Sequence, residues 1–150
     1  MDLGERADAL RLRLREMLAE LLPTDWSGSF SDDPRVTSVT RQVLDRLAEE
    51  GLLTIDWPPE YGGAGATLWE QAVVREEMWA HLEPRGPQYM GLSWVGPTIM
   101  EFGTREQRDT HLPRIAKGEA VWCQGFSEPE AGSDLGALSL AATADAEGWT

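Results

Sequence analysis

Cysteine is nearly missing from this sequence of 150 residues. The single cysteine, Cys123, excludes an intramolecular disulfide. This favours a reducing compartment, so we expect the protein to be cytoplasmic. Because no histidine lies near Cys123 in the sequence, we expect its thiol to be a small buried apolar group rather than a nucleophile.

Basic residues are scarce as well. Lysine and arginine together number 13 against 26 aspartates and glutamates, which gives a net charge of -13. Nucleic acids and anionic lipid surfaces bind through positive charge. The composition therefore argues against both as partners.

Long apolar runs are missing too. No window approaches the roughly 18 uninterrupted apolar residues of a membrane span, so we expect no membrane insertion. Residues 1–10 are acidic and hold no apolar run, unlike a signal peptide. Histidine occurs only as His81 and His111, whose spacing is not that of metal ligands, and we expect no metal site.

Two amphipathic helices are predicted in the first third of the chain. The first runs over 3–21 and ends before Pro23; a polar loop over 24–34 and a second helix over 35–50 follow, with Gly51 as its C-terminal cap. Their apolar stripes consist of Leu3, Ala7, Leu10, Leu14, Met17 and Leu21, and of Val36, Val39, Val43 and Leu47.

The segment WPPEYGGAG over 57–65 combines prolines and glycines with two aromatic residues. Its prolines and glycines oppose regular structure, whereas Trp57 and Tyr61 offer apolar surface to bury. A packed loop is therefore favoured over a flexible linker. A phosphate-binding loop is the less favoured alternative, because no lysine follows the glycines.

A third helix is predicted to begin at Thr67, where Glu70 completes a capping box. It is apolar on most sides, which is typical of a central helix. Glu76, Glu77 and Glu128 are acid–base candidates only by residue type. Of the neighbouring Glu76 and Glu77, we expect one to be solvated and the other to pair with Arg75 or Arg85.

Two further helices follow. One is expected over 91–102 with a kink near Pro97, and the next begins with a capping box of Thr104 and Gln107. Pro113 is expected to distort this last helix before it reaches Lys117.

Residues 118–150 differ in composition, with six acidic residues and no lysine or arginine. Strands are predicted over 120–126 and 138–144, and a third from Trp149. The order of helices and then strands predicts a mainly α protein, with a helical domain over 1–117 and the beginning of a β-domain over 118–150. Within the second part, residues 124–134 are typical of either a ligand-binding loop that uses backbone N–H groups or an ordinary turn between strands.

Four segments carry a family resemblance. SEPEAGSD over 127–134 resembles the TEPxAGSD motif of the acyl-CoA dehydrogenases. The segments over 57–65, 96–107 and 112–119 resemble that family's P-x-x-Y-G-G-x-G, G-P-x-I-x-x-x-G-T-x-x-Q and L-P-x-x-A-x-G-E motifs, in the same order. The sequence is thereby identified as similar to the helical N-terminal domain of the family, followed by the first strands of an incomplete β-domain.

The resemblance implies FAD as cofactor and oxidation of an acyl-CoA thioester at Cα–Cβ to the 2,3-enoyl-CoA, with electron-transferring flavoprotein as electron acceptor. By position in the motif, Gln124, Phe126 and Ser127 would lie along the flavin ring system. Gly132 and Ser133 would approach the flavin pyrophosphate, and Ser133 would also lie near the acyl-CoA.

The resemblance also implies what lies outside these residues. The family's catalytic glutamate belongs to a C-terminal helical domain, so we assign no catalytic residue here and expect a fragment or truncated member that is not catalytic alone. Two alternatives stay open: a non-catalytic flavin- or acyl-CoA-binding subunit that needs a partner chain, and a structural domain whose loop is empty. We expect the protein to be a homo- or hetero-oligomer.

Overall fold

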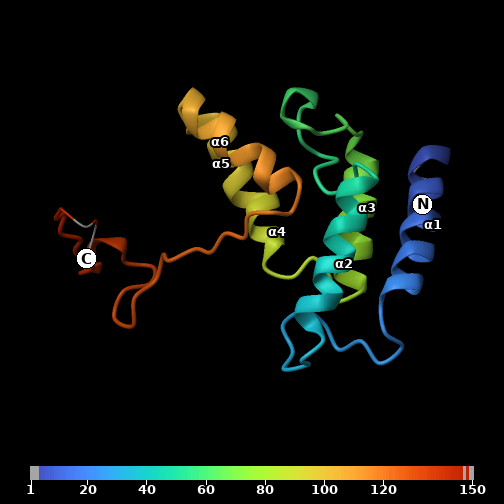
Figure 1. The fold of residues 1–150 in the computed structure, drawn as a ribbon, viewed down its shortest axis with the longest axis horizontal. Coiled ribbons are helices and arrows are strands. Elements are labelled where there is room, and N and C mark those ends of the chain that lie inside the picture. Colours follow the sequence, from blue (N-terminus) through green and yellow to red (C-terminus); the bar gives the residue numbers. More distant parts are fainter. Residues whose placement is uncertain (1–3, 147, 149–150) are drawn as a thin grey trace.

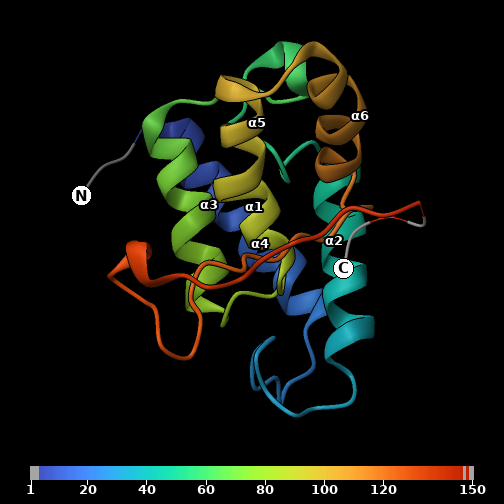
Figure 2. The same ribbon diagram turned by 90° about the vertical axis from the view of Figure 1, so that its left-hand side faces the viewer.

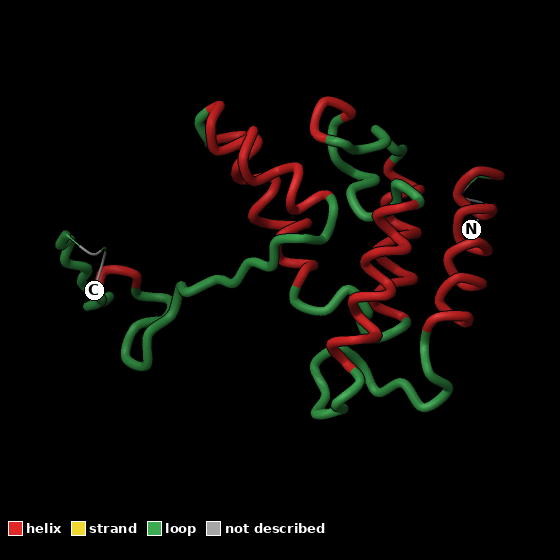
Figure 3. Tube along the Cα trace, viewed as in Figure 1, coloured by secondary structure: helices red, strands yellow, loops and turns green. Residues whose placement is uncertain are grey.

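The computed structural model describes residues 4–146 and 148, and these residues form a mainly helical fold, as predicted (Figures 1 and 3). The helices are α1 (Glu5–Leu21), α2 (Val36–Glu49), α3 (Leu68–Ala80), α4 (Gln88–Met90), α5 (Gly96–Phe102) and α6 (Arg105–Ala116). Shorter elements are the 3-10 turns η1 (Pro59–Tyr61) and η3 (Leu135–Ala137) and the π-helical turn η2 (Gly91–Val95). None of these described helices has the length and apolar composition needed to cross a membrane.

Helix α1 packs against both α3 and α2, and the described parts of the predicted apolar stripes face this core (Figure 2). In α1 and α2 the described members of the stripes form the core, with Leu21 and Val36 partly buried, while Leu3 lies outside the described residues. Helix α1 ends at Leu21, before Pro23, as expected. The prediction that the third helix is central is wrong in part. It buries one face, while Leu68, Trp69 and Trp79 are exposed.

Both predicted capping boxes are confirmed. Thr67 Oγ1 accepts a hydrogen bond from the N–H of Glu70 at 3.3 Å, and Glu70 Oε2 accepts one from the N–H of Thr67 at 2.9 Å. The same exchange joins Thr104 and Gln107 at the start of α6. Each box satisfies backbone donors that have no partner within the helix.

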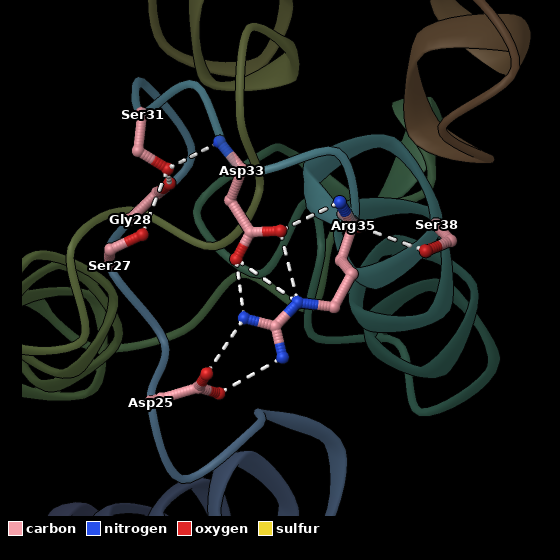
Figure 4. A network of polar contacts seen from close by, with 7 residues as sticks. All are labelled: Asp25, Ser27, Gly28, Ser31, Asp33, Arg35 and Ser38. Carbon is pink, nitrogen blue, oxygen red and sulfur yellow. Dashed lines mark hydrogen bonds and ion pairs between the residues drawn. The ribbon is translucent and has the colours of Figure 1, made fainter.

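The loop over 24–34 is held by Arg35, which stands at the start of α2 (Figure 4). The guanidinium donates to both carboxylate oxygens of Asp25, at 3.0 and 3.1 Å, and to Asp33, at 2.6 Å for the shortest contact. Hydrogen bonds from Arg35 hold the pKa values of Asp25 and Asp33 below their ordinary range. These ion pairs order the loop together with the buried Ser29, whose hydroxyl donates to the carbonyl of Glu83 at 2.7 Å.

The loop over 57–65 is packed, as predicted. Trp57 is only 2% exposed, and the backbone closes on it at Gly63, where an added Cβ would lie 1.7 Å from the carbonyl oxygen of Trp57. Gly62 adopts a left-handed conformation with φ of 86°. The glycines therefore serve the turn and the close approach to Trp57.

The expected kink near Pro97 takes the form of the π-helical turn η2, which joins α4 to α5 just before Pro97. Pro113 lies inside α6, which continues to Ala116.

The strands predicted over 120–126 and 138–144 do not form in the described residues. The chain there runs away from the helices without forming a named strand in the described residues, and an isolated bridge joins Glu128 and Ala131 (Figures 1 and 3). An extended segment needs neighbouring strands to pair its backbone groups, and no described segment supplies them. The strand expected from Trp149 lies outside the described residues.

Candidate functional site

A groove of about 540 Å³ lies where the α4–η2–α5 succession, α6 and the extended segment after α6 meet. The residues that line it are Met90, Trp94, Val95, Thr98, Ile99, Phe102, Gly103, Gln107, His111, Trp122, Cys123, Gln124, Gly125 and Phe126. Within the described chain, this lining includes no carboxylate, lysine or arginine. The groove therefore suits an apolar ligand and offers no carboxylate as a proton acceptor.

The helical wall of the groove follows a simple spacing. Met90, Trp94, Thr98 and Phe102 are four residues apart, and each of them faces the groove. None of these four residues was predicted as a site residue, although a repeat of four is the signal of one helical face.

The opposite wall is the extended segment, which brings two predicted site residues to the groove. Gln124 and Phe126 line it, and Phe126 is 66% exposed. Beside them Trp122 lies edge-on to His111, with ring centroids 5.2 Å apart. The indole Nε1 of Trp122 is buried without a hydrogen-bond partner among the described residues.

The expectation of a buried Cys123 is wrong. Its side chain is exposed at the groove, because the extended segment that carries it does not enter a sheet. Burial of a short apolar side chain in a strand requires a second layer against that strand, and the described residues form none.

The other predicted site residues do not line the groove. Ser127, Gly132 and Ser133 are exposed in the loop over 127–134. The structure thus brings Gln124 and Phe126 to one site and leaves the three remaining residues on a neighbouring loop.

Glu128, an acid–base candidate only by residue type, organises that loop and does not line the groove. Its Oε2 accepts hydrogen bonds from the N–H and hydroxyl of Ser139, both at 2.9 Å, and its Oε1 accepts one from the N–H of Leu140 at 2.8 Å. The backbone hydrogen bonds from Ser139 and Leu140 hold the pKa of Glu128 below its ordinary value. Its carboxylate therefore fastens residues 139–140 to the start of the loop.

Glu77, the buried one of the two neighbouring acid–base candidates on α3, belongs to the helical core. The predicted pairing with Arg75 or Arg85 is wrong: Arg11 and Arg15 of α1 donate to Glu77 at 2.8 and 3.0 Å. Arg75 and Arg85 contact Asp56 and Glu83 instead. The α1–α3 packing decides this partner, which lies more than 60 residues away in the sequence.

Two opposing effects act on the pKa of Glu77. Burial by itself raises the pKa, but hydrogen bonds from Arg15 and Arg11 outweigh burial, and the pKa lies below the ordinary glutamate value. Glu77 is therefore a charged structural anchor, and it does not line the groove. Glu76, as expected of one of the two, is largely exposed, although it also contacts Arg11 at 2.6 Å.

Comparison with known proteins places the chain in a family. A family model described as acyl-CoA dehydrogenase, N-terminal domain, matches residues 5–119. The acyl-CoA dehydrogenase IpdE1 of Mycobacterium tuberculosis is 39% identical over 147 residues, which cover 95% of this chain and 38% of that protein.

Solved structures agree. The ChsE4-ChsE5 complex of Mycobacterium tuberculosis matches with a TM-score of 0.80 and 33% identity over 97% of this chain and 36% of that chain. A protein described as the Tcur3481-Tcur3483 steroid ACAD matches with a TM-score of 0.77 and 35% identity over 97% of this chain and 38% of that chain. The chain spans less than two fifths of the length of these relatives. With most of its helical part matched by the family model and its fold shared with these structures, the chain belongs to the acyl-CoA dehydrogenase family.

Proposed function

We propose that this chain contributes the helical part of a flavin-dependent acyl-CoA dehydrogenase, which oxidises an acyl-CoA thioester at Cα–Cβ to the 2,3-enoyl-CoA. The observation that carries the proposal is the apolar groove bounded by Gln124 and Phe126. An acyl group bound there would lie between the helical face of α4–α5 and the motif segment. The apolar lining would bind it by excluding water.

The groove fits one edge of a flavin. A flat ring system needs an aromatic neighbour and polar groups at its rim, and Phe126 and Gln124 offer these side by side. When bound, FAD supplies an acceptor for the hydride that leaves the substrate. We further propose that Ser127, Gly132 and Ser133 bind the flavin, with Ser133 also near the acyl-CoA, and that residues 118–150 belong to a second domain beginning after residue 117.

The family resemblance assigns proton removal to a glutamate, and the described lining of the groove contains no carboxylate. Because no described groove residue is a carboxylate, we propose that the base comes from a segment outside these 150 residues or from a partner chain. Electron-transferring flavoprotein is the proposed electron acceptor.

A specific observation favours the second candidate function, a binding or assembly subunit in a hetero-oligomer. Both solved neighbours above are described by pairs of names, and one of them is called a complex. On that reading this chain would supply one wall of a shared site. The description of one neighbour as a steroid ACAD extends the proposed substrates to acyl-CoA thioesters with fused rings.

Binding to matched variants tests the groove. Phe102 lines the groove and is 81% exposed, while Leu12 is 62% exposed on α1, away from it. Phe102→Gln should weaken acyl-CoA binding about tenfold, because it removes an apolar contact. The affinity is measured by calorimetric titration of the protein in the form that its source organism makes. Leu12→Gln should leave the affinity unchanged. Equal affinities for the wild type and Phe102→Gln would remove the groove from the proposal.

A further inference from the structure

The helix that forms one wall of the groove contains an irregular turn. In η2 the N–H of Gly96 donates to the carbonyl of Gly91, five residues back, instead of the carbonyl of Leu92, four residues back. Such a turn holds one residue more than an α-helical turn. Each residue of an α-helix turns by about 100°, so the extra residue rotates all side chains after it by that amount.

The turn leaves the carbonyl of Leu92 without a donor from its own helix. Gly96 is engaged with Gly91, and residue 97 is a proline, which has no N–H. The indole Nε1 of Trp57 donates to the Leu92 carbonyl at 3.0 Å. Leu92 and Trp57 are both 2% exposed, so this hydrogen bond lies away from solvent.

The indole ring also occupies the space beside the turn. A Cβ added to Gly96 would lie 2.2 Å from Cζ2 of Trp57. Trp57 is itself fixed by the close approach of Gly63 to its carbonyl. A side chain from the loop over 57–65 thus holds the π-helical turn by a hydrogen bond and by shape.

The groove is lined by residues within and after this turn. Trp94 belongs to η2, and Thr98 and Phe102 follow on α5. Trp94 is 47% exposed and lies edge-on to Tyr89, with ring centroids 5.8 Å apart. Trp94 has the largest side chain of the turn, and its half-exposed ring therefore sets the shape of this part of the wall.

We propose that Trp57 is a positioning residue for the groove: by holding η2 it places the Trp94 ring, which selects between slender and bulky acyl groups. This inference rests on the proposed function, since it takes the groove as the acyl site. Without the indole donor, the Leu92 carbonyl would recruit the N–H of Gly96. The turn would then tighten toward α-helical geometry and rotate the side chains that follow.

The test compares the affinities for a straight-chain acyl-CoA and a fused-ring acyl-CoA. Both are measured on the protein in the form that its source organism makes. Trp57→Phe keeps an aromatic ring and removes the donor, and it should change the ratio of the two affinities about tenfold, the scale of one methylene in an apolar pocket. Trp69→Phe, at an exposed position on α3, should leave the ratio unchanged. A wild-type ratio in Trp57→Phe would overturn the inference.

A double mutant distinguishes positioning from general support of the fold. If Trp57 acts through Trp94, Trp57→Phe has no further effect on the ratio in a Trp94→Ala background. Independent effects of the two substitutions on the ratio would overturn the inference, because they would show that Trp57 changes the ratio by a route other than the Trp94 ring.

Pro97→Ala supplies a variant at an exposed position that keeps the inference testable if Trp57→Phe does not fold. It restores an N–H at residue 97 and leaves the Trp57 contact in place, so the ratio should stay at the wild-type value. A changed ratio would show that the proline, not Trp57, holds the turn. A wild-type protein that binds neither acyl-CoA would contradict the proposed function itself, whereas normal binding with an unchanged ratio in Trp57→Phe would contradict only the role of Trp57.

Discussion

At the scale of single residues, the missing side chain of Gly63 lets the backbone lie against Trp57. In Gly63→Ala the added Cβ would meet the Trp57 carbonyl oxygen at 1.7 Å, so the backbone of the loop must move. We expect a loss of about 2–4 kcal/mol in the free energy of unfolding, measured by urea denaturation. Gly125→Ala, where nothing lies within 4 Å of the added Cβ, is the control and should unfold like the wild type.

Two neighbouring glutamates offer a second comparison at this scale. Glu77 is 1% exposed and bound by Arg11 and Arg15, whereas the neighbouring Glu76 is largely exposed. Glu77→Gln should cost about 2 kcal/mol of stability by removing a buried charge from its partners. Glu76→Gln should change the stability by less than about 0.5 kcal/mol.

The pH dependence of stability follows from the same residue. The pKa of Glu77 is lower in the folded state than in the unfolded chain, where a glutamate titrates near about 4.3. Its contribution is therefore fully present above that pH and is lost as the pH falls through the folded pKa. As the pH is lowered from about 6, the melting temperature should fall less steeply for Glu77→Gln than for the wild type. An equal fall of the melting temperature with pH in both proteins would show that Glu77 is not a source of acid sensitivity.

At the element scale, helix starts are specified by local side chains. The box of Thr104 and Gln107 fixes the start of α6, the helix that supplies Gln107 and His111 to the groove. Thr104→Ala should destabilise the protein by about 1 kcal/mol because a backbone N–H loses its acceptor. Thr110→Ala, inside the same helix and exposed, should be neutral or slightly stabilising in the same denaturation experiment. Equal losses for the two variants would argue against the cap.

At the scale of the whole molecule, charge opposes an anionic cofactor. The chain carries -13, and residues 118–150 hold six acidic residues and no lysine or arginine. We expect the 150-residue chain to bind FAD weakly and to show no dye-linked oxidation of acyl-CoA. Salt screens the repulsion between the protein and the flavin phosphates, so FAD binding should strengthen between 20 and about 200 mM salt, where the screening length falls to roughly 7 Å.

Riboflavin, which lacks the phosphates, is the matched control and should bind with little salt dependence. Fluorescence quenching of each flavin measures both affinities. A stoichiometric yellow protein with acyl-CoA turnover would contradict the expected weakness, and identical salt dependence for FAD and riboflavin would contradict the electrostatic cause.

Local patterns in the sequence determined most of the helices, because caps and apolar periodicity act within a few residues. The stripes of α1 and α2, the boxes at Thr67 and Thr104 and the packed loop around Trp57 were all predictable in this way. The motif segments also pointed to the right family. Contact of Gln124, Phe126, Ser127, Gly132 and Ser133 with a flavin stays a prediction.

Only the tertiary structure decided which distant residues meet. Glu77 pairs with α1 rather than with nearby arginines, Trp57 donates to a carbonyl on another helix, and Cys123 is exposed. The predicted strands failed for the same reason, since a strand depends on partners that its own residues do not specify. Helical periodicity and capping are local, whereas ion pairs, sheet pairing and the shape of a groove depend on how whole elements pack.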